Sequence, residues 1–299
     1  MKPFVVRPKA TPHIRCAGLA TVIDTPSGSE IYIKNEAQQY GRSIKGRVAY
    51  AMVRRSLETG MPIVESSSGN LALGLGYWAA RLGAPAPLCL VDDGCEPTMR
   101  EELLRAGCRI EVIALAPHEI ANQAGVFKRI ARAREYQTNG YYWPNQYDND
   151  EWVHVHQMTT GKEIWQDPLR FNLVVSAVGT GATVSGIALA RPAHSSALVT
   201  AVEPKGSVIF GGHLGPYRVA GAGNPFTPRN YRKEAIDLEI VVDDPETFGM
   251  AHRLRQAGCA IGSSGSMVVV GAARALDQLS NKPLAILLVI ADDGWYEVL

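Results

Sequence analysis

Three short segments of the chain carry residue types that can do chemistry on an anionic substrate. Lys45 stands within residues 41–47, residues 66–70 read Ser-Ser-Ser-Gly-Asn, and residues 179–183 read Gly-Thr-Gly-Ala-Thr. A lysine amine forms an imine most readily when it is partly desolvated, because desolvation lowers its pKa. The second segment offers hydroxyls and helix-start N–H groups to a carboxylate, and the third offers the same groups to a phosphate. The segments therefore predict an imine-forming amine, a carboxylate site and a phosphate site.

Each segment also has a simpler interpretation. Taken alone, Lys45 is also compatible with a surface residue at a helix start, residues 66–70 with an N-cap, and residues 179–183 with a plain glycine turn. Two cationic neighbours, Arg42 and Arg47, would lower the pKa of Lys45 further if they lay close to it. The prediction therefore depends on the set of segments and on their order.

A fourth turn, Ser263–Ser266, also precedes a helix-like segment. A serine hydroxyl there can hydrogen-bond a pyridine nitrogen, or it can cap the helix. The run at 179–183 is not a dinucleotide fingerprint, because its sixth position is Val184, and no Gly-Lys-Ser/Thr follows it as in a P-loop. An amine, two anion sites and a pyridine partner are what an enzyme that uses pyridoxal 5′-phosphate (PLP) requires.

Short apolar runs alternate with segments of helical periodicity, which predicts an α/β fold with mostly parallel sheets and helices on both faces. The expected strands are Ile31–Lys34, Pro62–Glu65, Ala86–Val91, Arg109–Leu115, Asn172–Val178, Ala197–Val202, Ile236–Val242 and Pro283–Ile290. The expected helices are Arg47–Thr59, Asn70–Leu82, Pro97–Ala106, His118–Tyr136, Trp152–Gln166, Ala182–Arg191, Pro245–Ala257 and Ser264–Leu279. The signal loops then lie at carboxyl ends of strands, where such sheets bind ligands. The Gly- and Pro-rich stretch 205–232 is either an active-site loop or a surface excursion.

The composition excludes several other classes of protein. The chain has 299 residues and a formal net charge of +1, which gives no electrostatic case for nucleic acid or an acidic membrane. No apolar run is long enough to span a bilayer, and the first residues lack the apolar core of a signal peptide. The five cysteines form no C-x-x-C pair, so we expect no disulfide framework and no metal site. We expect a cytoplasmic protein in a reducing compartment.

The ordered set of motifs resembles the fold type II PLP enzymes, specifically the cysteine synthase and cystathionine β-synthase branch, over roughly residues 15–299. Members of this family carry Ser-Val-Lys, Thr-x-Gly-Asn-Thr, Gln-Phe, Thr-Thr-Gly-x-Glu-Ile and Gly-Thr-Gly-Gly-Thr. The matching segments here are Ser43–Lys45, Ser67–Leu71, Gln146–Tyr147, Thr159–Ile164 and Gly179–Thr183, followed in the expected order by Ala201–Pro204, Gly221–Gly223 and Gly262–Gly265. The resemblance implies two open, mostly parallel twisted sheets of the tryptophan synthase β type.

The resemblance also implies a role for each site residue. Lys45 would form the internal aldimine with PLP and later move protons at Cα and Cβ. The other cofactor-binding residues would be Asn70 at the ring oxygen, Gly179, Thr180, Gly181, Ala182 and Thr183 at the phosphate, and Ser263 at the pyridine nitrogen. Ser67, Ser68, Gly69 and Gln146 would hold the substrate carboxylate. Residues 1–47 and 141–299 would form a larger PLP-binding domain, residues 48–140 a smaller mobile domain, and the chain a homodimer.

The expected activity is β-elimination and β-replacement on an activated serine of the O-acetylserine or O-phosphoserine type, through an aminoacrylate. A small nucleophile would then give cysteine or a related β-substituted alanine. One alternative is a serine/threonine dehydratase or a racemase of the same fold. Another is a non-catalytic binding protein that retains the fold, although an intact Lys45 argues against it.

Two departures from the family pattern leave the substrates open. Leu71 replaces the last threonine of the substrate loop and cannot donate a hydrogen bond, so the pose of the substrate should differ. Asp292 and Asp293 stand where the family often has Pro-Ser-x-Gly-Glu-Arg-Tyr. These carboxylates would either hold a cationic or amine co-substrate or lie in water. The leaving group, the nucleophile and the pathway stay open.

Overall fold

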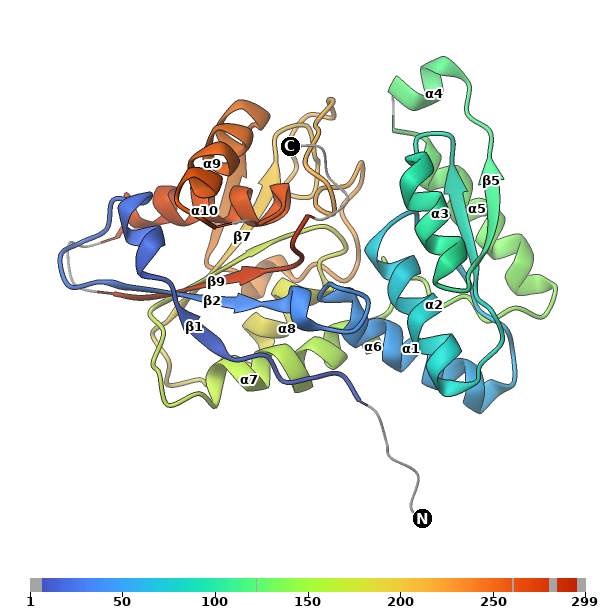
Figure 1. Ribbon diagram of the computed structural model, residues 1–299, viewed down its shortest axis with the longest axis horizontal. Helices are drawn as coiled ribbons and strands as arrows, with labels where there is room; N and C mark the ends of the chain where they lie inside the picture. The colour runs from blue at the N-terminus through green and yellow to red at the C-terminus, as the bar shows by residue number, and fades with distance from the viewer. Residues whose placement is uncertain (1–6, 122, 260, 280–283, 295–299) are drawn as a thin grey trace, which may run out of the picture. The chain divides into compact units, whose positions relative to one another are not determined.

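The computed structural model describes residues 7–121, 123–259, 261–279 and 284–294 (Figure 1), and its contacts divide into two compact units. In the described part of the chain, unit 1 comprises residues 7–11, 37–120 and 124–145. Unit 2 comprises residues 12–36, 121 and 123, and the described residues from 146 onward. Each unit has its own sheet, so each is described by itself.

Unit 2 is built on a six-stranded sheet with the order β1-β2-β9-β6-β7-β8. Its strands are β1 (His13–Arg15), β2 (Glu30–Asn35), β6 (Leu173–Ala177), β7 (Leu198–Pro204), β8 (Leu238–Val242) and β9 (Ala285–Ile290). All neighbouring pairs are parallel except β1 and β2, which are antiparallel. The central strands β6 and β9 are almost entirely apolar, as strands covered on both faces should be.

Helices cover both faces of this sheet (Figure 1). One face carries α9 (Asp244–Gln256) and α10 (Ser263–Leu276), and Val202, Ile286 and Leu288 pack against α10 in the main core. A Cβ at Gly271 would lie only 2.5 Å from the Val202 side chain, so a glycine permits this close approach. The other face carries α6 (Asp150–His156), a π-helical turn (Gln157–Gly161), α7 (Lys162–Trp165) and α8 (Ala182–Leu189).

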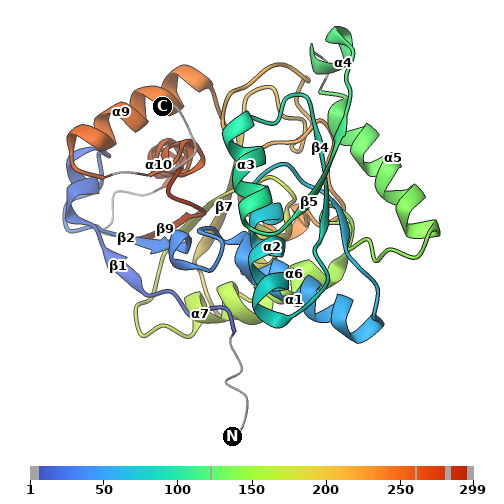
Figure 2. The same ribbon diagram turned by 45° about the vertical axis from the view of Figure 1, so that its right-hand side comes forward.

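Unit 1 has a parallel three-stranded sheet of β3 (Val64–Ser66), β4 (Leu88–Asp92) and β5 (Arg109–Ile113). Its helices are α1 (Lys45–Thr59), α2 (Asn70–Leu82), α3 (Pro97–Arg105), α4 (Pro117–Ala121) and α5 (Gly125–Thr138). The strands lie between α2 and α3 on one side and α5 on the other (Figure 2). Leu88 and Leu90 point toward α5, where they pack on Ala133.

The expected α/β architecture with mostly parallel sheets is confirmed, and α2 spans the residues predicted for it. One prediction of a single helix is wrong, and another is confirmed with a local irregularity. The expected helix His118–Tyr136 is divided into α4 and α5, and Gln123 between them has a φ of 53°. The expected helix Trp152–Gln166 contains the π-helical turn. Strand β1, which has three residues and a half-exposed pattern, was not predicted, and Pro283 of the expected strand Pro283–Ile290 lies outside the described residues.

Candidate active site

Lys45 is the first residue of α1, and the neighbouring helix α2 holds this helix start in place. A Cβ at Gly41, where φ is 81°, would lie 3.0 Å from the Gly74 Cα, and the Trp78 indole N–H donates to the Gly46 carbonyl at 2.8 Å. Burial lowers the pKa of Lys45 from 10.5 to about 8. The neutral fraction of this amine at pH 7 therefore rises to about one in ten.

The expected contribution of Arg42 and Arg47 to this lowered pKa is not found. Arg42 is exposed, while the buried Arg47 donates to the Thr11 hydroxyl at 3.4 Å. Removal from water lowers the pKa of Lys45. The surface interpretation of this residue is therefore wrong, because its side chain is largely withdrawn from solvent.

Residues Ser67–Asn70 follow β3 and lead into α2, with Gly69 as the N-cap residue. The Ser67 hydroxyl accepts the N–H of Ala72 at 3.1 Å, so part of this loop does cap the helix. The thiol of Cys95, which comes from the loop after β4, lies 3.6 Å from the Ser68 carbonyl. Leu71 is 2% exposed and belongs to the apolar interior.

Arg129 of α5 supports the strand that precedes this loop. Its Nε donates to the Ser66 hydroxyl at 3.3 Å, and its guanidinium also forms an ion pair with Asp92 at the end of β4. Neither residue was identified from the sequence, because an isolated arginine in an amphipathic helix gives no signal for such a contact. The pair ties the carboxyl ends of β3 and β4 to α5.

In unit 2, residues Gly179–Thr183 form the turn between β6 and α8. Gly181 is the N-cap residue with a φ of 84°, and a Cβ there would lie 2.6 Å from the Tyr231 backbone nitrogen. A Cβ at Gly179 would lie 3.0 Å from the Gly221 carbonyl oxygen. Only glycine fits Gly181, and the α8 N-terminus adds N–H groups that point toward an anion.

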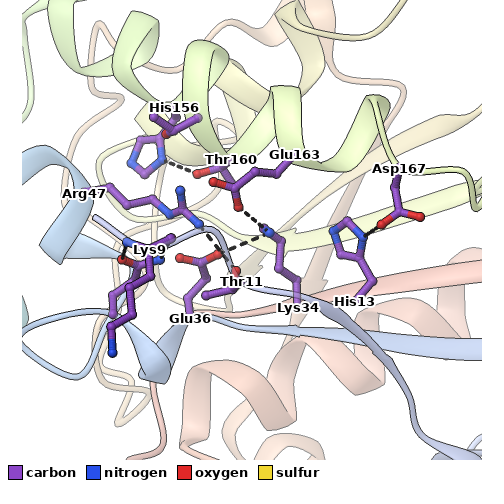
Figure 3. Close-up of polar contacts among 12 residues, drawn as sticks. Lys9, Thr11, His13, Lys34, Glu36, Arg47, His156, Thr160, Glu163 and Asp167 are labelled. Atoms are coloured by element: carbon purple, nitrogen blue, oxygen red, sulfur yellow. Dashed lines mark hydrogen bonds and ion pairs between the residues drawn. The ribbon is translucent and has the colours of Figure 1, made fainter. Parts of the chain in front are cut away.

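His156 supports this turn from α6. Its Nε2 lies 3.2 Å from the Thr183 hydroxyl. Its Nδ1 lies 3.0 Å from the Thr160 hydroxyl (Figure 3). The ring is 1% exposed. His154 of the same helix is exposed, whereas His156 lies against the turn.

Glu163, the glutamate of the Thr-Thr-Gly-x-Glu-Ile segment, has a clear structural partner in unit 2. The Lys34 ammonium lies 2.7 Å from Glu163 and 3.7 Å from Glu36, and all three side chains are mostly or fully buried (Figure 3). Nearby, His13 pairs with Asp167 at 2.6 Å. These contacts connect α7 and the segment after it to β1 and β2. They therefore hold in place the helical segment that also includes His156.

Ser263 and Asp292 lie at the same end of the sheet in unit 2. Ser263 is the first residue of α10, and its hydroxyl accepts the N–H of Ala220 at 3.0 Å. Gly262, rather than a serine, is the N-cap residue, so the capping interpretation of Ser263 is wrong. Asp292 is 1% exposed, accepts the N–H of Gly294, and has one carboxylate oxygen 3.8 Å from the Cβ position of Gly221.

Gln146 is 8% exposed, and its carbonyl accepts the Asn230 side-chain amide at 2.8 Å. The structure thus arranges the predicted residues in two groups. Unit 1 holds Lys45 and the loop Ser67–Asn70 on two packed helices. Unit 2 holds Gln146, Gly179–Thr183 and Ser263.

These groups fit PLP by the chemistry of their donors. The amine of Lys45 has a lowered pKa, the glycine turn before α8 admits no Cβ at Gly181, and the hydroxyl of Ser264 is buried without a hydrogen-bond partner beside Ser263. PLP carries an aldehyde, a phosphate and a pyridine nitrogen. The amine would match the aldehyde, the glycine cradle the phosphate, and the serine-bearing helix start the pyridine nitrogen. In the described residues no cluster of three or more His, Cys, Asp or Glu side chains could hold a metal, and no helix there is long and apolar enough to cross a membrane.

Comparison with known proteins agrees with this fit. A family described as "Pyridoxal-phosphate dependent enzyme" matches residues 7–292, so the chain belongs to the PLP-dependent enzymes. Within the PLP-dependent enzymes, the chain is similar to the cysteine synthases. A cysteine synthase of Staphylococcus aureus is 29% identical over 287 residues, which cover 92% of this chain and 89% of that protein.

Two solved structures extend the likeness to the fold. A hydrogen sulfide-producing enzyme of Fusobacterium nucleatum, solved with an α-aminoacrylate intermediate, is 27% identical, with a TM-score of 0.83 over 96% of this chain and 87% of that one. O-acetyl serine sulfhydrylase isoform 3 of Entamoeba histolytica is 24% identical, with a TM-score of 0.85 over 97% of this chain and 88% of that one. The expected fold type II architecture and PLP cofactor are therefore confirmed.

Proposed function

We propose that the chain catalyses β-replacement on an activated serine, such as O-acetylserine or O-phosphoserine, with a small nucleophile. The product would be cysteine or a related β-substituted alanine. The likeness to cysteine synthases supports the class of reaction. The observation that carries the proposal is the largely buried side chain of Lys45 at the start of α1, where burial lowers the pKa of the amine to about 8.

Lys45 is the proton-transferring group in this proposal. PLP, when bound, supplies an electron sink for the bonds at the substrate Cα. The Lys45 Nζ takes the proton from Cα and returns one after the nucleophile has added at Cβ. A base whose pKa lies near the working pH can do both, because neither of its forms is scarce.

The remaining residues bind and orient. Gly179, Thr180, Gly181, Ala182 and Thr183 hold the phosphate, Asn70 the ring oxygen and Ser263 the pyridine nitrogen. Ser67, Ser68, Gly69 and Gln146 hold the substrate carboxylate through N–H, hydroxyl and amide donors. Leu71 supplies no hydroxyl and is turned into the apolar interior, so the carboxylate depends on fewer donors than the family motif provides.

The nucleophile is sulfide, a thiol or a small amine. Asp292 is buried rather than in bulk water, which supports an amine, since a buried carboxylate can accept a hydrogen bond from an amine nucleophile. The division into residues 1–47 with 141–299, and a mobile segment 48–140, forms part of this proposal, as does a homodimer. Analytical ultracentrifugation of the purified chain tests the homodimer.

A dehydratase or racemase of the same fold is the second candidate. It would release pyruvate and ammonia, or invert the amino acid, without an added nucleophile. A non-catalytic binding protein is the third, and it would show no spectral response to any amino acid. These outcomes separate the three candidates in a single set of assays.

The first experiment is the visible absorbance of the purified protein with PLP. We expect a band from the lysine-bound cofactor that Lys45→Ala abolishes and that O-acetylserine or O-phosphoserine shifts to longer wavelength. Lys162→Ala is the matched control, because Lys162 also starts a helix but is exposed, so its replacement should leave the band unchanged. Nucleophiles are then screened by which of them restores the original band. The absence of this band, even with added PLP, would refute the proposal.

A further inference from the structure

Residues 224–231, which read Asn-Pro-Phe-Thr-Pro-Arg-Asn-Tyr, lie in the stretch that the sequence left undecided between an active-site loop and a surface excursion. The segment contains no helix or strand, yet its two asparagines are buried: Asn224 is 7% exposed and Asn230 is 0% exposed. A buried amide has to satisfy both its donor and its acceptor groups, so its partners define what it positions.

Asn224 reaches the phosphate turn. Its side-chain Nδ2 donates to the Gly179 carbonyl at 2.7 Å. Its backbone is fixed independently, because its N–H donates to the Ser207 hydroxyl at 3.1 Å and that hydroxyl donates to the buried Glu203 at 2.5 Å. Its neighbour Gly223 donates to the Val178 carbonyl at 2.8 Å. Asn224 is thus a rigid donor aimed at the first residue of the turn.

Asn230 reaches the segment that begins with Gln146. Its Nδ2 donates to the Gln146 carbonyl at 2.8 Å, and its Oδ1 accepts the N–H of Asn149 at 2.8 Å. Its own N–H donates to the Tyr147 carbonyl at 3.3 Å. Three hydrogen bonds from one fully buried residue therefore fix the backbone of the segment that carries the Gln146 side chain.

The end of the segment packs on the glycine turn. Tyr231 lies so close to Gly181 that a Cβ there would be 2.6 Å from the Tyr231 nitrogen. Tyr231 is held from the other side, where its hydroxyl donates to Glu239 of β8 at 2.7 Å. The N–H of Arg232 donates to the Ser185 hydroxyl of α8 at 2.9 Å. One continuous segment thus contacts both ligand-binding loops of unit 2.

We propose that Asn224 and Asn230 are positioning residues that fix the phosphate turn and the Gln146 segment relative to each other. The inference rests on the proposed function for the roles of those two loops. Neither asparagine touches cofactor or substrate in this account. Asn224 acts through the Gly179 carbonyl on cofactor affinity, and Asn230 acts through the Gln146 backbone on amino-acid affinity.

The two roles predict a split in binding that a general loss of folding would not produce. Asn→Asp retains the shape and removes the Nδ2 donor, which leaves a backbone carbonyl without that bond, but it also adds a negative charge. Asn→Ala removes the same donor without adding a charge, so both substitutions are made at each position. We expect Asn224→Asp to weaken PLP binding to the apo protein about tenfold. We expect Asn230→Asp to raise the KM of the activated serine by a similar factor, with kcat and PLP affinity little changed.

The affinity for PLP is measured by quenching of tryptophan fluorescence in the apo protein, which requires no turnover. The affinity for the amino acid is measured both as KM and as the concentration that gives half of the spectral shift. Thr227→Ala is the matched control, because the Thr227 hydroxyl in the same segment donates to the Val208 and Ile209 carbonyls, outside both ligand loops. It should change neither affinity by more than about twofold.

Several outcomes would overturn the inference. One is an unchanged PLP affinity in Asn224→Asp, and another is equal changes of both affinities in the two variants. If either Asp variant fails to fold by circular dichroism, the Asn→Ala variant of that position carries the same prediction. A wild-type protein that binds PLP but does not turn over an activated serine would refute the proposed function alone, since the Asn224 measurement would still stand. A wild-type protein that binds no PLP would refute both.

Discussion

The Nε2 of His156 lies 3.2 Å from the hydroxyl of Thr183, the last residue of the proposed phosphate turn, while its Nδ1 lies 3.0 Å from the Thr160 hydroxyl. The buried imidazole therefore links α6 and the π-helical turn to the first turn of α8. The two helices also approach closely, because a Cβ at Gly186 would lie 2.6 Å from the His156 Cβ. The orientation of the Thr183 hydroxyl is thus set from a second layer of side chains.

We expect His156→Phe to lower the free energy of unfolding by about 1–3 kcal/mol, because the ring volume stays and both threonine hydroxyls lose a buried partner. PLP affinity should fall as well, since the Thr183 hydroxyl loses its fixed orientation. Urea unfolding of the apo protein and a PLP titration measure the two effects. His154→Phe, at an exposed position of the same helix, is the control and should leave both values nearly unchanged.

We expect Gly181→Ala to lower the free energy of unfolding by clearly more than the strain of its positive φ alone would. Gly181 has a φ of 84° and would place a Cβ 2.6 Å from Tyr231, whereas Gly211 has a φ of 86° and no heavy atom within 4 Å of its Cβ position. Gly211→Ala should therefore cost only the conformational strain, about 1 kcal/mol. Gly181→Ala should cost clearly more and should also weaken PLP binding, as thermal unfolding and the same titration will measure. Equal losses in the two variants would rule out the steric argument.

The pKa of Lys45 predicts how stability depends on pH. Burial lowers it from 10.5 to about 8, so between these values the unfolded chain binds more protons than the folded chain. The free energy of unfolding should rise with pH across this window, because the folded state no longer buries a charged amine. We expect the apo protein to gain up to about 2 kcal/mol over this range relative to Lys45→Met. Parallel stability curves for the two proteins would contradict the lowered pKa.

Cys16 and Cys259 form a pair that the sequence did not suggest. Their sulfur atoms lie 3.8 Å apart, both residues are partly exposed, and both thiols are free. A thiol-specific oxidant such as diamide should join them in an intramolecular disulfide, with the loss of two titratable thiols. Burial raises the pKa of the Cys259 thiol, so the reaction should be faster in mildly alkaline than in neutral buffer.

Peptide mapping of the oxidised protein identifies the crosslinked residues. Cys16→Ser should prevent the loss of both thiols. The buried Cys89 and Cys108 serve as internal controls, because the oxidant should not reach them in the folded protein. Retention of all five thiols, or crosslinking of other cysteines, would contradict the assignment.

The sequence predicted the elements best where the pattern was long and its ends were marked. The helix Asn70–Leu82 has a glycine on either side, and its predicted bounds agree with α2. The expected helix 118–136 failed because its apolar spacing continues across residues near Gln123, where the backbone leaves the helix. Strand β1 was missed because three half-exposed residues carry too little apolar periodicity to be distinguished from a loop.

The residues on which the loops depend were much harder to foresee. Arg129, Asn224 and Asn230 belong to no motif, and each acts on a loop many positions away. His156 likewise belongs to no motif that assigns it a contact with the turn 179–183. Such contacts depend on which side chains the connections between strands bring together in one layer of the fold. The spacing of residues along the chain does not indicate which side chains these are.

The sequence by itself determined the class of fold and the order of the glycine- and serine-rich loops, and it predicted Lys45 as the reacting amine. This was possible because strand-to-helix turns and glycine-rich runs are local, and local geometry follows from neighbouring residues. Only the tertiary structure decided that Lys45 is withdrawn from water, that Ser263 lies inside its helix rather than capping it, and that the stretch 205–232 is anchored by buried amides. Burial and long-range hydrogen bonds depend on packing between distant segments, and packing exists only once the chain has folded.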